Sequence, residues 1–335
     1  MKLSETLLVD VIRGNLVESV HQCDCVVVNA AGETIMAWGE PDREMYARSS
    51  IKPVQALPLV ESGAADHYNF SPAEVALSCA SHNSEAVHVK AVKDVLGRIG
   101  LGETDLECGP HRPYDEASSD DMIREGVEPC RLHNNCSGKH MGFLTTTAHL
   151  GEDPKGYIKA EHGVQKRILE AMSETSDCDL SATARGTDGC GIPVVGMSLS
   201  GLARSMARMA DPSGLGAVRE VAAKRIVASM IAEPHMVAGR NRMDTLAMQA
   251  MGNVAFKAGA EGVMIAIVPE RGLGIAVKAR DGNSRACEVA ALWIINKLDL
   301  ISNSAAREIA NLMEPDVKNR NDLIVGKICV HEGTA

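Results

Sequence analysis

The chain has 335 residues, of which 45% are hydrophobic, so a sizeable core is expected and bulk disorder is excluded. Its net charge of −10 argues against nucleic acid as a partner, because neutralising phosphates requires a surplus of Lys and Arg. No uninterrupted apolar run reaches the ~20 residues that span a bilayer, and the first residues lack a signal-peptide core. We therefore expect a cytoplasmic protein without a membrane partner, whose ten cysteines are reduced.

The first part of the chain begins with strands and then turns helical. Residues 7–12 are rich in apolar side chains, and residues 25–28 and 34–38 flank a glycine-containing turn, which predicts a hairpin. Residues 71–74 read Ser-Pro-Ala-Glu, the pattern of a capping box with proline at the first helical position. A helix is therefore expected to begin there and to run toward Cys79.

Helical patterns continue through the middle of the chain. Val87, Ala91 and Val95 recur every four residues, which predicts an amphipathic helix that ends near Gly97. Further helical stretches are expected between Gly, Pro and Asp breaks, at residues 154–172, 197–210, 214–232 and 284–299.

Strand patterns return near the C-terminus. Residues 262–268 and 273–278 are two apolar runs separated by a Pro-Glu-Arg-Gly turn and predict a second hairpin, and residues 323–330 predict a last strand. Strands at both ends around a helical middle indicate an α+β fold, an α/β sandwich. One sheet built from both chain ends would pack with helices and carry a helical lobe. We expect a single domain over residues 1–335.

Ser49 and Lys52 stand three positions apart, in an S-x-x-K pattern. On the first turn of a helix, positions i and i+3 share a face, so the lysine amine can reach the serine hydroxyl. A lysine acts as a base only when it is neutral, which requires burial or a nearby cation to lower its pKa. S-x-x-K is the nucleophile motif of serine β-lactamases and penicillin-binding proteins, but an exposed lysine one turn from a capping serine has the same pattern. Ser50 is a rival nucleophile whose spacing fits a helix N-cap better.

Two further strings continue the motif order of those enzymes. Ser81-His82-Asn83 has the S-x-N form of their second motif, and Lys257-Ala258-Gly259 has the K-x-G form of their third. The K-x-G string directly precedes the apolar run at 262–268, which puts it beside a strand. Because the three motifs occur in order, they favour a serine–lysine site.

Two of the cysteines lie in polar strings. Cys136 and Lys139 are three apart in Asn-Asn-Cys-Ser-Gly-Lys-His, so on a helical turn their side chains point the same way. Asp188 and Cys190 stand in a glycine-rich turn that lets the backbone approach something closely. Two thiolates and a neutral amine could bind Zn²⁺ and leave a fourth position for water or substrate. A catalytic Cys–His pair and two buried thiols stay open as alternatives.

Taken together, these strings resemble one known family. The resemblance is carried by Arg48-Ser49-Ser50-Ile51-Lys52-Pro53, Cys79-Ala80-Ser81-His82, Cys136-Ser137-Gly138-Lys139-His140, Thr187-Asp188-Gly189-Cys190 and the Lys257/Gly262 region. They are similar to the rhizobial-type L-asparaginases, also called the asparaginase II family, over roughly residues 8–330. The Cys-Ser-Gly-Lys-His and Thr-Asp-Gly-Cys strings are specific, whereas S-x-x-K is not.

The resemblance implies a serine β-lactamase/glutaminase-like fold, a homodimer, and hydrolysis of L-asparagine to L-aspartate and ammonia. It implies two Ser–Lys tandems, which fall on Ser49 with Lys52 and on Ser81 with Lys257. It implies a zinc site that falls on Cys136, Lys139 and Cys190. It also implies that the substrate is held near the metal by Arg48, His140 and Asp188. We add Asn83, from the S-x-N string, as a further substrate contact.

The expected reaction is acyl transfer. Ser49 attacks the side-chain amide while Lys52 takes its proton, and backbone N–H groups near Ser49 hold the oxyanion. Ammonia leaves, and water hydrolyses the β-aspartyl enzyme. Ser81 and Lys257 would relay protons or tune Lys52, because a second ammonium nearby lowers the pKa of the first amine.

The substrate is a zwitterion, which needs a cation for its carboxylate and an anion for its ammonium. Arg48 suits the carboxylate through bidentate pairing, and Asp188 suits the ammonium, although each could form a structural ion pair instead. Zinc held by two thiolates is a poor electrophile, so we expect it to position the substrate more than to activate water.

Two other functions fit part of the sequence. A penicillin-recognising serine hydrolase would explain the three motifs, but a secretory signal would be expected for it, and the Cys-Ser-Gly-Lys-His string has no place there. A non-enzymatic zinc-binding or amino-acid-binding module would explain the cysteine–lysine cluster but not both Ser–Lys pairs.

Overall fold

The computed structural model describes residues 5–331, and the chain divides into two compact units. Among the described residues, the first unit, called the sheet unit here, comprises residues 5–50, Met197–Asp211 and residues 246–331. The second, called the helical unit, comprises Ile51–Gly196 and Pro212–Thr245. Each unit is therefore assembled from segments that are far apart in the sequence.

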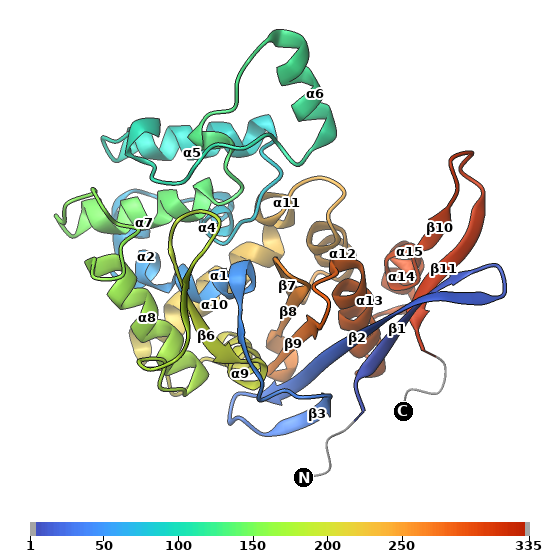
Figure 1. Ribbon diagram of the computed structural model, residues 1–335. Coiled ribbons are helices and arrows are strands. Elements are labelled where there is room, and N and C mark those ends of the chain that lie inside the picture. The colour runs from blue at the N-terminus through green and yellow to red at the C-terminus, as the bar shows by residue number, and fades with distance from the viewer. Residues whose placement is uncertain (1–4, 332–335) are drawn as a thin grey trace. The chain divides into compact units, whose positions relative to one another are not determined.

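The sheet unit is built on an eight-stranded sheet with the order β10-β11-β1-β2-β9-β8-β7, in which β3 also pairs with β2. All of these pairings are antiparallel. The strands are β1 (Leu7–Arg13), β2 (Leu16–Asn29), β3 (Thr34–Trp38), β7 (Ala255–Gly259), β8 (Val263–Val268), β9 (Leu273–Ala279), β10 (Asp316–Lys318) and β11 (Ile324–Val330). In Figure 1 the strands β1 and β11, from opposite ends of the chain, run side by side.

This sheet confirms the predicted α+β fold. The two expected hairpins are β2–β3 and β8–β9, and the expected first and last strands are β1 and β11. Every residue of β8 is buried, which explains why its sequence is a continuous apolar run rather than an alternating one.

Two long helices pack on the sheet, α9 (Leu199–Ala210) and α13 (Ser284–Lys297), and both contact β8 and β9. The packing of α9 depends on Gly274, because a Cβ atom there would overlap the carbonyl oxygen of Ala203 in that helix. The other elements of this unit are β4 (Glu44–Tyr46), α14 (Asn303–Glu308) and α15 (Ala310–Met313). Helix α12 (Met243–Met251) spans the boundary between the units.

The helical unit holds most of the helices. Its elements are α1 (Lys52–Gln55), α2 (Leu57–Glu61), α3 (Ala64–His67), α4 (Pro72–Ser78), α5 (Ala86–Arg98), α6 (Glu116–Glu125), α7 (Ser137–His149), α8 (Gly163–Ser176), β5 (Arg185–Thr187), α10 (Ala217–Ala232) and α11 (Pro234–Val237). Strand β6 (Pro193–Ser198), which begins in this unit, pairs antiparallel with β5.

Helix α7 is the most enclosed of these elements, because all of its residues from Ser137 to Thr147 are buried. A helix that is buried on every face has to be covered by neighbours all round, and α2, α3, α4, α5 and α8 all contact it. Gly138 lets α4 come close, since a Cβ atom there would overlap the carbonyl oxygen of Leu77.

The predicted capping box is confirmed at the start of α4. Ser71 Oγ accepts the backbone N–H of Glu74 at 3.3 Å, and Glu74 Oε2 accepts the backbone N–H of Ser71 at 2.8 Å. The helix ends at Ser78, with Cys79 as its C-cap.

Helix α5 is present where we expected it, but its buried face differs from the predicted one. The prediction placed Val87 on the apolar face, whereas Val87 is 47% exposed and the neighbouring His88 is fully buried. The reason is a tertiary contact, because the His88 ring stacks between the rings of His82 and His235.

The helix predicted from residue 154 begins later, at Gly163. Residues 154–162 form turns instead, in which Gly156 has a left-handed φ of 71°. His162 caps the helix by accepting the backbone N–H of Val164 at 3.2 Å. The predicted helices at 197–210, 214–232 and 284–299 are confirmed as α9, α10 and α13, apart from a few residues at their ends.

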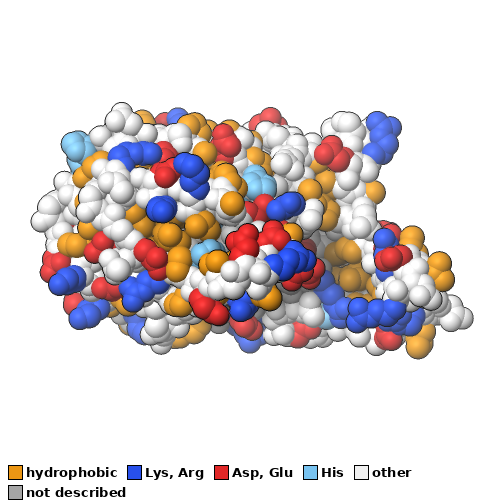
Figure 2. Space-filling view, turned by 90° about the horizontal axis from the view of Figure 1, so that it is seen from above, with side chains coloured by type: hydrophobic (Ala, Val, Ile, Leu, Met, Phe, Trp, Pro, Cys, Tyr) orange, Lys and Arg blue, Asp and Glu red, His pale blue; other side chains and the backbone are white. Residues whose placement is uncertain are grey.

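Within residues 5–331, no helix is long and apolar enough to cross a bilayer. On the face shown in Figure 2, acidic and basic side chains are interspersed with apolar ones. None of the ten cysteines, which all lie within residues 5–331, forms a disulfide.

Candidate active site and metal centre

Ser49 lies in a 3-10 helix, Arg48–Ile51, that runs directly into α1. Arg48 has a left-handed φ of 52°, a conformation that is costly for a residue with a side chain and that concentrates at functional sites. The prediction that Ser50 is the helix N-cap is wrong. The N-cap of α1 is Ile51, and the Ser50 hydroxyl instead donates to the carbonyl of Ala47 at 2.7 Å, inside the turn.

Lys257 is confirmed on a strand edge, because β7 is the last strand in the sheet order. Its side chain is fully buried, and Nζ donates to the carbonyl of Ala258 at 2.7 Å. The glycine of the K-x-G string has a packing role. A Cβ atom on Gly259 would lie 2.9 Å from the oxygen of Ala47 and 3.1 Å from the nitrogen of Ser50. The segment that carries Ser49 therefore lies against the end of β7, within the sheet unit.

Lys52 is the centre of a buried polar cluster in the helical unit. Only 1% of the residue is exposed, and Nζ donates to the carbonyl of Ala80 at 2.5 Å and to Ser81 Oγ at 2.9 Å. A third contact joins Nζ to Cys136 Sγ at 3.1 Å. The structure thus shows a direct Lys–Ser hydrogen bond, between Lys52 and Ser81. The pairing of Ser81 with Lys257 stays a prediction, because the two residues belong to different units.

His82, which follows Ser81, has both ring nitrogens occupied by the protein. Nδ1 accepts the backbone N–H of Ser84 at 3.1 Å, so Nε2 carries the hydrogen and donates to Ser137 Oγ at 2.9 Å. That hydroxyl in turn donates to the carbonyl of Leu132. Burial holds the pKa of His82 well below its usual value. His82 is therefore a satisfied structural histidine.

The amide of Asn83 is engaged at both ends. Nδ2 donates to the carbonyl of Arg240 at 2.9 Å, and Oδ1 accepts from the Arg242 guanidinium at 3.2 Å. These bonds tie the segment after Ser81 to residues 239–242. A substrate contact by Asn83 stays a prediction.

The two cysteine strings meet in the helical unit. The sulfur atoms of Cys136 and Cys190 and a carboxylate oxygen of Asp188 all lie within 4.8 Å of one another. Lys139 Nζ donates to Cys190 Sγ at 3.0 Å, and the lysine is 1% exposed. Cys136 and Lys139 come from the start of α7, whereas Asp188 and Cys190 come from the turn between β5 and β6. The predicted ligands Cys136, Lys139 and Cys190 are brought together, and Asp188 joins them.

The electrostatics of this group favour one thiolate. The hydrogen bond from Cys136 and the charge of Lys139 outweigh burial and lower the pKa of Cys190 to about 5. The same hydrogen bond and burial raise the pKa of Cys136 to about 12. Burial lowers the pKa of Lys139, but the two sulfur atoms outweigh it and raise that pKa to about 12. Buried sulfur donors beside a carboxylate are a donor set that suits Zn²⁺, so the residues fit the metal.

His140 is fully buried on the first turn of α7, and its Nδ1 lies 2.6 Å from the hydroxyl of Tyr157. Burial and the charge of Lys139 lower the pKa of His140 to about 3. The sequence interpretation missed Tyr157. No sequence signal pointed to Tyr157, because it lies in a stretch predicted to be helical and its contact with His140 joins a turn to α7.

A second group with metal-ligand atoms is Glu85, His88 and His235, whose ligand atoms also lie within 4.8 Å of one another. The His88 and His235 rings are stacked with an interplanar angle of 9°. A ring nitrogen directs its lone pair in the ring plane, so two parallel rings do not converge on one ion. Glu85 also pairs with Arg240 at 3.2 Å. This group is a packing stack.

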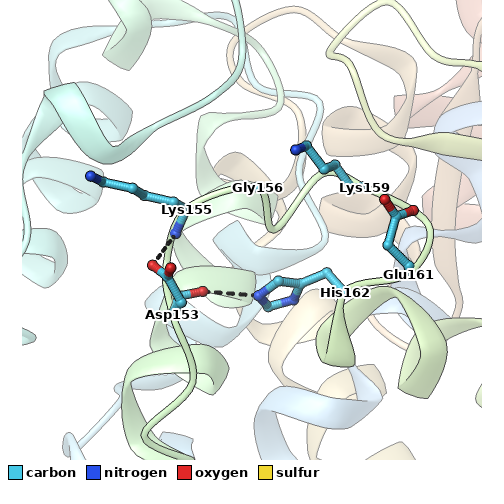
Figure 3. Close-up of a pocket in the computed structure, with 6 residues that line it drawn as sticks. All are labelled: Asp153, Lys155, Gly156, Lys159, Glu161 and His162. Carbon is cyan, nitrogen blue, oxygen red and sulfur yellow. Dashed lines mark hydrogen bonds between the residues drawn. The ribbon is translucent and has the colours of Figure 1, made fainter.

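A hollow of about 420 Å³ lies elsewhere in the helical unit (Figure 3), and the residues that line it are Asp153, Lys155, Gly156, Lys159, Glu161 and His162. Asp153 makes two hydrogen bonds to other lining residues. Its carboxylate accepts the backbone N–H of Lys155, and its backbone carbonyl accepts the ring N–H of His162, both at 2.9 Å. None of the predicted site residues lines this hollow.

The sequence was also compared with models of known protein families. The family model for L-asparaginase II matches residues 9–330. The chain belongs to the L-asparaginase II family. Membership makes it an asparaginase-type amidohydrolase with a small-molecule substrate. A search of curated proteins found no match.

A comparison with solved structures finds several matches at low sequence identity, each with a TM-score below 0.5. A structure of Mglu in its native form is 14% identical over 85% of this chain and 66% of its own, with a TM-score of 0.48. A putative β-lactamase from Bacteroides dorei is 12% identical over 89% and 94% of the two chains, with a TM-score of 0.42. The octameric penicillin-binding protein homologue from Pyrococcus abyssi is 12% identical over 85% and 74%, with a TM-score of 0.43. This chain spans about two thirds of the length of that Mglu chain.

Proposed function

We propose that this L-asparaginase II family member hydrolyses L-asparagine to L-aspartate and ammonia through a serine–lysine nucleophile. The observation that carries the proposal is Lys52. It is buried, and its Nζ contacts are a carbonyl, the Ser81 hydroxyl and the Cys136 sulfur. Lys52 thus has no carboxylate partner among residues 5–331, as expected of a lysine that exchanges protons with a hydroxyl rather than one held in an ion pair.

Ser49 is the proposed nucleophile and Lys52 its general base. The two lie three positions apart where a 3-10 helix passes into α1, and side chains at i and i+3 of a 3-10 helix are eclipsed. Ser49 attacks the side-chain amide carbonyl, and its proton passes to Lys52 and then to the leaving ammonia. Water hydrolyses the β-aspartyl ester by the reverse proton path.

Ser81 and Lys257 are the further residues of the proposed proton path. Ser81 accepts from Lys52 Nζ at 2.9 Å, so its hydroxyl can pass a proton to or from that amine. Lys257 is buried on β7 beside the segment that carries Ser49. In this proposal Arg48 binds the carboxylate of the substrate and Asp188 binds its ammonium.

Cys136, Lys139 and Cys190 are proposed to hold a zinc ion, with Asp188 beside them. When bound, zinc supplies a fixed positive charge that orients the zwitterion near the acylation site. The thiolates of Cys136 and Cys190 tie the start of α7 to the turn before β6. We further propose that the enzyme is a cytoplasmic homodimer, and light scattering on the purified chain tests the oligomeric state.

An ammonia-release assay tests the function directly. The purified protein is expected to release ammonia from L-asparagine. L-Glutamine is assayed side by side to measure the preference, because one extra methylene changes transition-state binding by about 1–3 kcal/mol. A chromogenic cephalosporin is the control for a penicillin-recognising hydrolase, and we expect no hydrolysis of it. Cephalosporin turnover without ammonia release would contradict the proposal.

The metal is tested separately from activity. Elemental analysis of protein purified without chelator should find about one zinc per chain, because thiolate sites bind zinc tightly. Cys190→Ala should lose it, and Cys178→Ala, which changes a cysteine outside the cluster, should keep it. A zinc content below about one ion per two chains would contradict the ligand assignment.

A further inference from the structure

His140 has one ring nitrogen bound by the protein and one that is not. Nδ1 lies 2.6 Å from Tyr157 Oη, whereas Nε2 is buried and has no hydrogen-bond partner among the described residues. The great majority of buried polar atoms have a partner, so a buried nitrogen without one points to a group that the protein binds.

The Tyr157 hydroxyl determines which nitrogen of His140 carries the hydrogen. A phenol has one hydrogen to donate, and Tyr157 Oη already accepts the backbone N–H of Glu107 at 2.9 Å. If the hydroxyl donates to Nδ1, the neutral ring carries its hydrogen on Nε2, and that single N–H lacks a partner. If Nδ1 donates instead, both the hydroxyl hydrogen and the Nε2 lone pair are left without partners.

The first arrangement is favoured because it leaves one buried polar group unsatisfied rather than two. A doubly protonated His140 ring would not reduce the number of buried polar groups without partners. Its two N–H groups would again leave the Tyr157 hydroxyl hydrogen without an acceptor, in a place where Tyr157 and His140 are both fully buried.

Tyr157 is itself held firmly in place. The backbone N–H of Gly156 donates to the Glu107 carboxylate at 2.6 Å, and Gln165 donates to the Tyr157 carbonyl at 2.9 Å. Its ring meets the His140 ring edge to face, with centroids 5.4 Å apart. The hydroxyl therefore has little freedom to turn away from Nδ1.

We propose that Tyr157 is a positioning residue that holds His140 in its Nε2–H form, so that His140 presents a hydrogen-bond donor to an oxygen of the bound substrate. The donor matches a carboxylate or an amide carbonyl, and it does not match an ammonium or an amide NH₂ group. The identity of the substrate rests on the proposed function, but the tautomer of His140 does not.

His82 provides a comparison inside the same unit. It also carries its hydrogen on Nε2, but that hydrogen is donated to Ser137 Oγ, and Nδ1 is bound as well. His82 is thus satisfied within the protein, whereas His140 has a donor left for a ligand.

The tautomer can be measured without turnover. Long-range ¹H–¹⁵N spectra of the ¹⁵N-labelled full-length protein report which ring nitrogen carries hydrogen, and the His140 signals are those that disappear in His140→Gln. The expected result at pH 7 is hydrogen on Nε2 and a bare Nδ1. Hydrogen on Nδ1 alone, or on both nitrogens, would overturn the inference even if the enzyme is fully active.

Tyr157→Phe tests the positioning role, since it keeps the ring and removes the hydroxyl. It should raise the KM for L-asparagine about tenfold, the effect of one weakened hydrogen bond, and change kcat less. Tyr68→Phe, which changes a tyrosine of the same unit outside the His140 contact, should leave KM unchanged.

Measuring Tyr157→Phe in a second mutant background tests whether its effect is merely structural. A glutamine amide carries its own N–H donors and needs no phenol to set them. In the His140→Gln background, Tyr157→Phe should therefore change KM by less than about twofold. A tenfold rise in both backgrounds, or in neither, would contradict the positioning role. If the wild type shows no asparaginase activity, the proposed function fails while the tautomer measurement still decides the inference.

Discussion

The buried lysines of the sheet unit and of the helical unit have different neighbours. In the sheet unit, Lys257 lies on a strand and donates to the neighbouring backbone carbonyl of Ala258. In the helical unit, Lys52 and Lys139 reach partners from remote parts of the chain, namely Ser81, Cys136 and Cys190. The buried lysines of the helical unit therefore join segments that are remote from one another in the sequence.

The sharpest way to test this difference is to remove each buried lysine. Lys52→Met should lower kcat for L-asparagine at least about 10³-fold, because it removes the proposed general base. Lys257→Met should lower it less, on the order of 10²-fold, because that lysine acts through the proton path. The measurement is ammonia release at saturating asparagine, with circular dichroism to confirm folding. A larger loss for Lys257→Met would assign the base to the sheet unit.

Close packing in the helical unit can be tested on a single helix. Gly138→Ala in α7 should lower the free energy of unfolding by about 2–3 kcal/mol, because the new Cβ atom meets the rigid carbonyl of Leu77. Gly142→Ala is the matched control. Its Cβ atom would lie 3.2 Å from the Ser78 hydroxyl and 3.3 Å from Ser78 Cβ, a milder contact than the overlap at Gly138, and alanine favours the helix by up to about 1 kcal/mol.

Urea denaturation measures both variants. Gly274→Ala is the counterpart in the sheet unit, where the new Cβ atom would meet the backbone of α9, so it should be at least as destabilising as Gly138→Ala. Equal stability of the Gly138 and Gly142 variants would contradict the close approach of α4 to α7.

The smallest expected effect concerns the capping box of α4. Burial raises the pKa of Glu74, but hydrogen bonds from Arg98 and from Ser71 outweigh it, so the folded-state pKa lies below 4.5. A depressed folded pKa stabilises the protein above pH 4.5, and this stability is lost as the pH falls through the folded value. Glu74→Gln should therefore cost about 1 kcal/mol at pH 7, and the difference from wild type should shrink in acid.

Ser71→Ala is the comparison for this prediction. It removes a capping hydroxyl that does not titrate and should cost about 1 kcal/mol at pH 7. Urea denaturation from pH 3 to pH 7 measures both variants. A Glu74→Gln difference that does not change with pH would contradict the assigned role of the Arg98 and Ser71 hydrogen bonds.

The sheet unit could be predicted from the sequence because its signals are local. The runs that became β8 and β9 are apolar and bounded by a turn with Gly272 at a left-handed φ of 58°. The capping box at Ser71 and Glu74 could be found for the same reason, since both partners lie within one helical turn. Cys136, Lys139 and Cys190 were also found from their strings, and the structure brings them together.

The features of the fold and the site that could not be predicted depend on contacts between remote segments, which no short sequence pattern encodes. The buried face of α5 is set by the His82–His88–His235 stack, which joins segments about 150 residues apart. The bond from Tyr157 to His140 depends on a turn that replaces the predicted helix. The bond from Lys52 to Ser81 crosses the two predicted tandems, because spacing along a helix does not show which remote hydroxyl lies beside a buried amine.

The most direct measurement is to locate the acyl group on the enzyme. The protein is mixed with L-asparagine, and the reaction is quenched in acid within the first turnovers. The protein is then digested, and the masses of its peptides are measured by mass spectrometry. We expect a β-aspartyl adduct on the peptide that contains Ser49, and its loss in Ser49→Ala while Ser50→Ala keeps it. An adduct on Ser81 would contradict the assignment of the nucleophile, and ammonia release with no adduct under any quench condition would contradict the acyl-enzyme itself.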